Sequence, residues 1–383
     1  MAKKTETDLR TLQVPLSMAR DVPKRLLDWY DANKRDLPWR RMRNPYATLV
    51  SEFMLQQTQV ATVVPYFERF LKEYPTVEAL AQASEQDVLR QWAGLGYYSR
   101  ARNLHASAKR IVSDYGGWVP DKFADLLFLP GVGRYAAGAI ASIGFDVPVP
   151  AVDGNVIRVI GRLLAIAADP ASPRVRQGYE QIAAQLVPQE RAGDYNQSVM
   201  ELGARVCTPG PGKPDCEHCP ISAFCQAFAQ GDPENYPPAA KRPDTVQVEE
   251  ACAVVREGDL CFITRCSDNA GRYRNMWEFP GVQLGPDADA PAVLRAHLKR
   301  EFGLRVWVGE EWAEIRHQVT HHRIRKRVFL CSLDKGATPD RSEEEVAQWA
   351  TTDQIAALPI GAPHKKILQL LTESQDFFGG PFG

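Results

Sequence analysis

The chain has 383 residues, and its 46 Lys and Arg against 47 Asp and Glu leave a formal net charge of -1. This length predicts two domains, and a composition of 44% hydrophobic and 24% charged residues excludes a disordered or fibrous chain. No apolar run approaches the length of a membrane span, and the first residues lack the apolar stretch of a secretory signal, so we expect a cytoplasmic protein without a membrane partner.

The first part of the chain predicts an all-α domain. Residues 1–21 predict a flexible extension, with structure beginning near Val22. From there to residue 230 apolar residues recur at helical spacing, and no alternating strand pattern precedes about residue 245. Basic residues gather near its start, usually a sign of a solvated surface and less often of a phosphate-facing one: Lys34, Arg35, Arg40, Arg41 and Arg43.

Glu52 is the first candidate for acid chemistry. The stretch PYATLVSEFMLQQTQV places it in an otherwise apolar helix, at the edge of the apolar stripe. Burial there would favour the neutral carboxyl, which is the form that a general acid needs. The alternative is an ordinary glutamate on a helix surface.

The stretch LPGVGRYAAGAI predicts a helix, a hairpin turn and a second helix. Gly131 and Gly133 make the turn tight. The backbone N–H groups of such a turn, at a helix N-terminus, would bind a phosphate group without sequence preference. Asp153 follows in VDGN, just before another predicted helix. The alternative is an ordinary turn, with Asp153 as a helix N-cap.

A cysteine cluster predicts a metal site. Four thiols stand at the spacing C-x8-C-x2-C-x5-C, and both an iron-sulfur cluster and a tetrahedral zinc ion take four cysteines: Cys207, Cys216, Cys219 and Cys225. Gly210 and Gly212 allow the long first loop to bulge, which would expose Lys213 or nearby backbone. Four further cysteines lack ligand spacing and are predicted to be buried thiols: Cys252, Cys261, Cys266 and Cys331.

The remainder predicts a linker and a second domain. Residues 231–245 contain four prolines and scattered charges, typical of a linker. Residues 246–375 combine short β-branched runs with a helical stretch, which predicts a small α+β domain, and residues 376–383 form a tail.

Five motifs in one order carry a family resemblance. SEFMLQQTQV, LGYYSRARNL, LPGVGRYAAGAI, VDGNVIRV and the cysteine loop resemble the helix-hairpin-helix glycosylases, and within them the MutY-type adenine DNA glycosylases, over most of residues 22–230. The resemblance implies a monomeric enzyme of base excision repair that binds double-stranded DNA with adenine opposite 8-oxoguanine, with downstream repair proteins as candidate partners. It also implies a 4Fe-4S cluster, although two residues more than the family's spacing separate Cys207 from Cys216, which keeps zinc as the alternative.

The same resemblance implies roles for individual residues. Glu52 matches the general acid that protonates adenine, and Asp153 the carboxylate that stabilises the oxocarbenium-like sugar. Tyr135 matches a pocket tyrosine and Asn155 a residue that orients Asp153. Gln57, Leu95 and Tyr97 match residues that fill the gap left by a flipped base, with Gln56 and Thr58 beside them and Gln197 against the adenine. The alternative places Leu95 and Tyr97 in the core and Gln56 and Gln57 on an exposed helix turn.

Tyr135 also separates two kinds of glycosylase. The related endonuclease III type carries lysine here, which forms a Schiff base and lets the strand be cut, and tyrosine cannot do so. We therefore expect a monofunctional enzyme. The alternatives are a glycosylase of the same superfamily acting on thymine in G·T mispairs or on oxidised pyrimidines, and a non-catalytic protein that binds lesions.

The C-terminal domain resembles Nudix folds through WEFPG and REFGL. Ala296, His297 and Arg300 replace charged residues of the Nudix pattern, so a magnesium-dependent pyrophosphatase is disfavoured. The resemblance implies instead that Val319, Thr320 and His321 probe 8-oxoguanine, with valine in place of an aromatic residue. Two further expectations concern a metal-binding or polar turn formed by His317, His321 and His322, and a phosphate-facing or solvated strand formed by Arg323, Arg325, Lys326 and Arg327.

Overall fold

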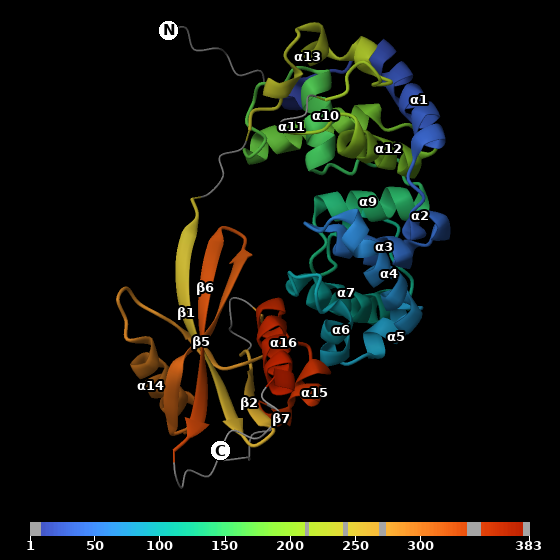
Figure 1. The fold of residues 1–383 in the computed structure, drawn as a ribbon. Coiled ribbons are helices and arrows are strands. Elements are labelled where there is room, and N and C mark those ends of the chain that lie inside the picture. The colour runs from blue at the N-terminus through green and yellow to red at the C-terminus, as the bar shows by residue number, and fades with distance from the viewer. Residues whose placement is uncertain (1–8, 211–213, 240–243, 268–272, 335–345, 378–383) are drawn as a thin grey trace. The chain divides into compact units, whose positions relative to one another are not determined.

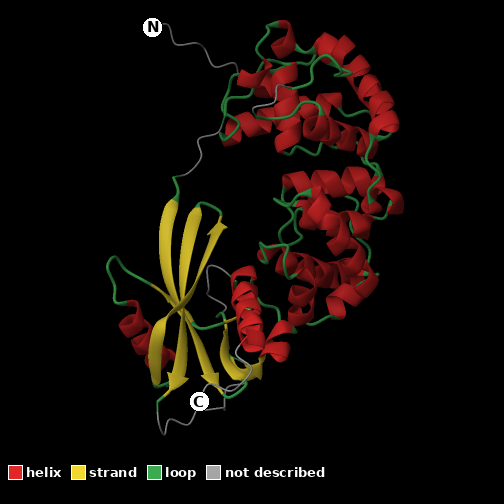
Figure 2. Cartoon of the chain, viewed as in Figure 1, coloured by secondary structure: helices red, strands yellow, loops and turns green. Residues whose placement is uncertain are grey.

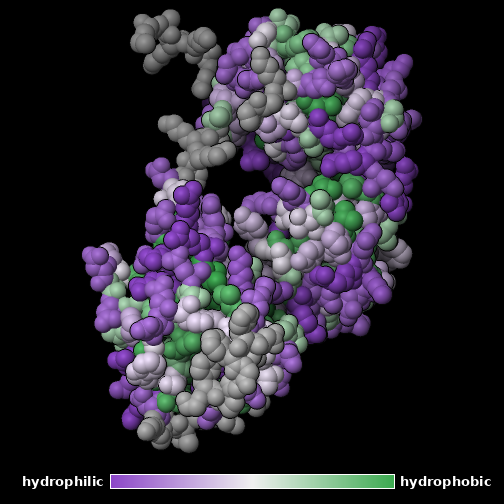
Figure 3. All heavy atoms as spheres, viewed as in Figure 1, coloured by the Kyte–Doolittle hydropathy of each residue, from purple (hydrophilic) through white to green (hydrophobic). Residues whose placement is uncertain are grey.

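The computed structural model describes residues 9–210, 214–239, 244–267, 273–334 and 346–377 (Figure 1). The chain divides into two compact units, which are residues 1–82 with 103–241 and residues 83–102 with 242–383. Helices make up the first unit and all the strands that the structure describes belong to the second (Figure 2). Polar and charged residues cover most of the face that Figure 3 shows. None of the described helices is both long and apolar enough to cross a membrane.

The all-α prediction for the first part of the chain is confirmed. The helices up to the boundary at Gln82 are α1 (Leu16–Asn33), α2 (Pro38–Met42), α3 (Pro45–Leu55), α4 (Val60–Glu73) and α5 (Val77–Gln82). After them come α6 (Glu85–Trp92), which belongs to the second unit, and α7 (Ser99–Tyr115), which the boundary cuts after Arg102. The remaining helices of the first unit are α8 (Phe123–Leu126), α9 (Arg134–Phe145), α10 (Gly154–Leu163), α11 (Pro173–Leu186), α12 (Ala192–Arg205) and α13 (Gln226–Ala229).

The expected extension ends earlier than the sequence indicated. A 3-10 turn at Leu9–Thr11 precedes α1, which begins at Leu16 rather than near Val22. Leu9 and Met18 are buried in a core that they share with residues of α10, α11 and α12. The prediction of a flexible segment is therefore wrong from Leu9 onward, because apolar side chains spaced along it pack against these helices; residues 1–8 lie outside the described part.

The second unit is a mixed sheet between helices. Its strands are β1 (Val246–Glu257), β2 (Leu260–Arg265), β3 (Trp277–Glu278), β4 (Gly281–Gln283), β5 (Val306–Val319), β6 (His322–Leu333) and β7 (Ala347–Thr351). They run in the order β3-β2-β1-β6-β5, with β4 against β1 and β7 against β2, and only the pairing of β1 with β6 is parallel among these named strands. α14 (Ala290–Phe302) covers one face, and α15 (Thr352–Ala356) and α16 (Ala362–Phe377) cover the other (Figure 1).

The predicted linker at residues 231–245 lies partly within the described residues, and its described start belongs by its contacts to the first compact unit. A 3-10 turn at Pro233–Asn235 is followed by chain without helix or strand as far as Ala239, where this described range ends, and β1 begins at Val246. The start expected at residue 246 lies near the boundary between the compact units at residues 241 and 242, but the second unit also includes residues 83–102, which the prediction placed in the helical domain. Among the later cysteines, Cys252, Cys261 and Cys331 are buried as predicted, whereas Cys266 is only partly buried.

The basic strand face of β6 is largely neutralised by glutamates. Arg325 donates to Glu249 and Glu314 on the neighbouring strands at 3.0 and 2.7 Å. Arg327 pairs with Glu311 at 2.7 Å in the same way. These residues therefore form cross-strand ion pairs on the sheet surface, which disfavours the expectation that they bind phosphates.

Candidate active site

The four predicted catalytic residues line one cavity in the first unit, together with Thr58 and Gln197. Glu52 on α3, Tyr135 on α9, and Asp153 and Asn155 at the start of α10 surround a space of about 220 Å³. A helix cap fixes where α3 begins: the Asn44 side chain accepts hydrogen bonds from two backbone N–H groups in the first turn of this helix. The fold thus gathers carboxyl groups that are about a hundred residues apart in the sequence.

Glu52 is buried and carries a raised pKa. It is 5% exposed, and burial raises its pKa to about 7, with the nearby Asp153 carboxylate adding to the rise and a hydrogen bond with Tyr135 opposing it. Its Oε2 has no hydrogen-bond partner among the described residues. A buried oxygen without a partner is costly, and a carboxyl with this pKa holds its proton near neutral pH, so Glu52 is equipped to donate to a ligand in the cavity.

Asp153 caps α10 and is held rigidly. One carboxyl oxygen accepts from the backbone N–H of Val156 at 2.8 Å, and the other accepts from the Asn155 amide at 2.7 Å. Burial raises the pKa of Asp153, against the effect of these hydrogen bonds. Asp153 is a helix N-cap, as the alternative expected, and it also lines the cavity, as its expected catalytic role requires. Asn155 orients it as predicted.

One wall of the cavity is a charged cluster that sequence reasoning missed. Arg35 and Arg40 both donate to the buried Glu201, at 2.7 to 2.9 Å. Burial by itself would raise the pKa of Glu201, but the bonds from these two arginines outweigh it and hold the pKa below its ordinary value. Arg40 also donates to the Gln197 side chain at 3.1 Å. The basic run indicated a solvated surface; only the approach of α12 turns Arg35 and Arg40 inward.

The hairpin forms as predicted. Between α8 and α9, Gly131 takes a left-handed conformation with φ of 76°, and a Cβ there would lie 2.6 Å from the Asn103 side chain. Gly133 is the extended N-cap of α9, and the part of the chain that the structure describes provides no side-chain cap for the first N–H groups of this helix. Such a helix start suits an anion.

The expected DNA wedge residues differ in exposure. Gln57 is exposed with φ of 58° just after α3, between the partly buried Gln56 and Thr58. Tyr97 is 41% exposed, as a side chain that enters DNA must be. Leu95 is 6% exposed, so in this conformation it packs within the second unit, and the alternative core assignment holds for it.

The four clustered cysteines surround one small cavity in the first unit. Cys207, Cys216, Cys219 and Cys225 line it together with apolar side chains of α10 and α12. The guanidinium of Arg162 donates to the Cys207 sulfur at 3.2 Å. The described residues contain no three His, Cys, Asp or Glu side chains already arranged around a single metal ion. Gly212 and Lys213 lie outside the described residues.

Arg158 joins the cysteine loop to the N-terminal end of α10, where Asp153 and Asn155 lie. Its guanidinium donates to the Asn155 side-chain oxygen at 2.8 Å and to the carbonyl oxygens of Gly203 and Cys207 at 2.6 and 2.8 Å. Asn155 in turn donates to Asp153. Cys207 and the Asp153 carboxylate are therefore linked by three consecutive hydrogen bonds through Arg158 and Asn155.

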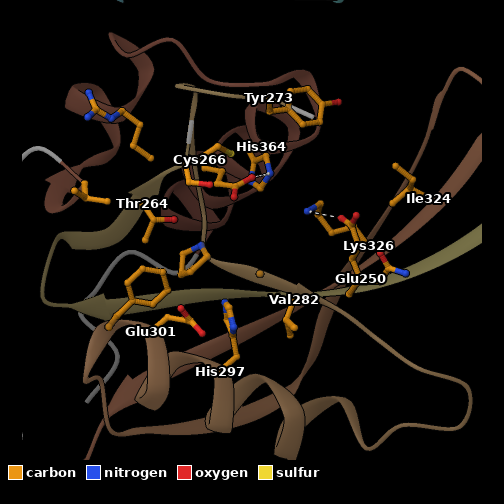
Figure 4. Close-up of a pocket in the computed structure, with 18 of the residues that line it drawn as sticks. Glu250, Thr264, Cys266, Tyr273, Val282, His297, Glu301, Ile324, Lys326 and His364 are labelled. Carbon is orange, nitrogen blue, oxygen red and sulfur yellow. Dashed lines mark ion pairs between the residues drawn. The ribbon is translucent and has the colours of Figure 1, made fainter. Parts of the chain in front are cut away.

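The second unit has a polar cavity of about 520 Å³ beside α14, shown in Figure 4. Its carboxylates are paired with cations or histidine: Glu250 with the buried Lys326 at 2.9 Å, and Glu278 with His364 at 3.5 Å. From α14 only His297 and Glu301 provide polar side chains, which point into the same cavity. Glu301 is thus the one carboxylate that the described part of α14 contributes to this cavity.

The predicted lesion-reading residues lie at the tip of a hairpin. Val319 ends β5, Thr320 and His321 form the turn, and His322 begins β6. Thr320 is exposed, with φ of 54°, and the His321 and His322 rings lie with centroids 4.1 Å apart and planes tilted by 40°. His317 instead lines the polar cavity, so the three histidines do not share one site.

Comparison with known proteins agrees with this geometry. The family model of the HhH-GPD superfamily base excision DNA repair proteins matches residues 50–185, and the model of the NUDIX domain matches residues 251–370. An adenine DNA glycosylase of Rattus norvegicus is 36% identical over 97% of this chain and 83% of its own length. That of Mycolicibacterium smegmatis is 45% identical over 55% of this chain and 71% of its own. A solved structure of a thermostable thymine-DNA glycosylase aligns with a TM-score of 0.51 and 28% identity, over 56% of this chain and 98% of that one.

Proposed function

This chain belongs to the adenine DNA glycosylases, and from that membership we propose that its substrate is duplex DNA carrying adenine opposite 8-oxoguanine, or opposite guanine. The proposal depends on one observation above all, which is that Glu52 and Asp153 share a cavity. Hydrolysis of an N-glycosidic bond passes through a positively charged sugar, and it needs an acid for the leaving base and an anion for the sugar. The two carboxyl groups supply both.

The residues of the cavity divide the reaction between them. Glu52, protonated near neutral pH, donates its proton to N7 of adenine as the bond between the sugar carbon and the base nitrogen breaks. Asp153 stabilises the cationic sugar, and a water molecule then adds to the sugar carbon and returns a proton to Glu52. Tyr135 has no amine that could attack the sugar, so we propose that the enzyme leaves an abasic site without cutting the strand.

The charged wall offers a means to recognise the base. Gln197 accepts from Arg40 through its oxygen, which fixes the orientation of its amide. The second lone pair of this amide oxygen can accept a hydrogen bond from the N6 amino group of adenine, which leaves N7 to Glu52. We propose that Gln197 contacts the flipped adenine, with the buried pair of Arg40 and Glu201 holding this wall rigid.

We further propose that the cysteine loop holds a 4Fe-4S cluster with a structural role. Four thiols around one apolar cavity, with the Arg162 guanidinium donating to one of them, fit a negatively charged group that takes four thiolates. Visible absorption and about four iron atoms per purified chain are expected. Zinc without visible absorption would refute this assignment.

Base release from three matched duplexes tests the proposed substrate. They carry adenine opposite 8-oxoguanine, adenine opposite guanine, and thymine opposite guanine, and products are resolved with and without alkali. We expect release of adenine only, with strand breaks appearing only after alkali treatment, and loss of release in Glu52→Gln. Release of thymine, or a borohydride-trapped covalent adduct, would contradict the proposal.

The same duplexes test how the opposite base is read. We propose that Thr320 and His321 at the hairpin tip contact 8-oxoguanine. Val319 offers less area for stacking than an aromatic side chain, so Val319→Phe should raise the preference for 8-oxoguanine over guanine. A preference that Thr320→Ala and His321→Ala leave unchanged would refute a role for this tip.

A further inference from the structure

By its sequence the segment 83–102 belongs to the helical domain, but its contacts place it with the C-terminal domain. It lies within the stretch 50–185 that the HhH-GPD model matches, yet by its contacts it belongs to the compact unit that contains the NUDIX match. It carries the loop 94–97, in which Tyr97 is an exposed large side chain. The contacts that support this loop therefore include residues far away in the sequence.

The loop 94–97 has a backbone that needs support. Gly94, Gly96 and Tyr97 have φ of 114°, 72° and 48°, and for Tyr97 this left-handed conformation is unfavourable. The Arg100 guanidinium donates to the carbonyl oxygens of Leu95 and Gly96 at 3.2 and 3.0 Å. The phenol of the next residue, Tyr98, accepts from the backbone N–H of Gly94 at 3.3 Å.

A turn at residues 273–276 contacts the chain both before and after the loop 94–97. On the N-terminal side of the loop, the side-chain amide of Asn275 donates to the Glu85 carboxylate at 2.8 Å. The backbone carbonyl oxygen of Asn275 accepts from the Gln86 side-chain amide at 3.0 Å. After the loop, the Tyr273 ring lies against the Tyr98 ring, with centroids 6.2 Å apart. The Arg102 guanidinium also donates to the backbone carbonyl at position 274, at 2.8 Å.

The turn itself is fixed to the sheet of the same unit. The backbone N–H of Asn275 donates to the carbonyl oxygen of Cys266 at 3.1 Å, and the backbone N–H of Cys266 donates to the carbonyl oxygen of Met276 at 2.9 Å. The Tyr273 ring packs over Gly361, where a Cβ would come within 3.1 Å of it. Tyr273 and Asn275 both have positive φ, of 55° and 59°. Strain of this kind persists only where surrounding contacts impose it, and here they join the sheet to the segment 83–102.

We infer that Tyr273 and Asn275 are positioning residues for the loop 94–97, and that they hold Tyr97 ready to enter the base stack when the adenine is flipped out. This inference rests on the proposed function. A side chain that fills the gap in a duplex acts best when its loop is already ordered, because the entropy of ordering then does not reduce binding. The turn provides that order, and the chemistry of base release is left to the first unit.

The test compares paired with unpaired adenine. Asn275→Gly keeps the left-handed backbone and the carbonyl oxygen but removes the amide that donates to Glu85, and Tyr273→Leu removes the ring against Tyr98. Single-turnover adenine release is measured from a duplex with adenine opposite 8-oxoguanine and from one with adenine opposite an abasic site, where no pair has to be broken. Asn235→Ala, at an exposed position in the linker, is the matched control.

We expect the double variant Tyr273→Leu/Asn275→Gly to lose about tenfold on paired adenine, the factor that one charge-assisted hydrogen bond contributes. On unpaired adenine its rate should stay within about twofold of wild type, which also shows that the variant is folded. A 2-aminopurine beside the target should brighten less on binding than with wild type. Tyr97→Ala should give the same pattern, and should add little in the background of the double variant.

Two outcomes overturn the inference. Equal losses on both substrates would mean that the turn serves stability alone, and additive losses with Tyr97→Ala would mean that the turn and the loop act separately. Failure of the proposed function looks different, because wild type itself would then release adenine from neither duplex.

Discussion

Replacing Glu52 by glutamine should stabilise the protein at high pH while abolishing its activity. Burial raises the pKa of Glu52 from an ordinary value of 4.5 to about 7, and one pKa unit corresponds to about 1.4 kcal/mol. The Glu52 carboxyl therefore binds its proton more tightly in the folded state than in the unfolded state. The stability that comes with this proton is complete below the unfolded pKa and is lost as pH rises through the folded one.

The magnitude follows from the two pKa values. Above the folded pKa the ionised Glu52 lowers the free energy of unfolding by about 3 kcal/mol, and at pH 5 by about 1 kcal/mol. Glutamine has the same shape and carries no charge. Glu52→Gln should thus gain about 2 kcal/mol on wild type between pH 5 and pH 8, which for a unit of this size is a shift of several degrees in Tm.

Thermal unfolding at several pH values measures this difference, with Glu68→Gln on the exposed side of α4 as the control. Adenine release by wild type should also fall as pH rises above about 7, since the acid loses its proton, and Glu52→Gln should lose about 100-fold or more. If Tm of wild type and Glu52→Gln changed in parallel with pH, the carboxyl would not be desolvated, and the argument for a general acid would be refuted.

Three further substitutions have distinct expected effects. Asp153→Asn keeps the N-cap acceptor, so its stability should change by less than about 1 kcal/mol in thermal unfolding while single-turnover adenine release falls about 100-fold or more; an active variant would remove Asp153 from the mechanism. Arg158→Ala breaks the link to Cys207 and should cost about 2 kcal/mol and lower the iron content, measured by absorption and by metal analysis. Lys326→Met leaves the partly buried Glu250 without the buried Lys326 ammonium group and should destabilise the second unit by about 2 kcal/mol in urea unfolding, whereas adding Glu250→Gln should restore most of the loss.

Much of the fold could be predicted from the sequence because local patterns carry it. Apolar residues at helical spacing, the glycines of the hairpin, and the β-branched runs after the linker each specify an element without reference to the rest of the chain. The hairpin around Gly131 and the cysteine spacing belong to this class, since a turn or a short loop is decided by the residues within it. The failure at Leu9–Arg20 has the converse cause: a few apolar residues show no period, and only a core already formed by other helices gives them a place to pack.

The composition of the cavity depended on tertiary structure. The sequence indicated that Glu52 could be an acid, but its pKa depends on burial beneath α9 and α10, which no local pattern contains. Arg35 and Arg40 look like surface residues until Glu201 of α12 lies against them. Charge and hydrogen bonding act through space over a few ångströms, so the chemistry of these side chains was decided only when the helices packed together.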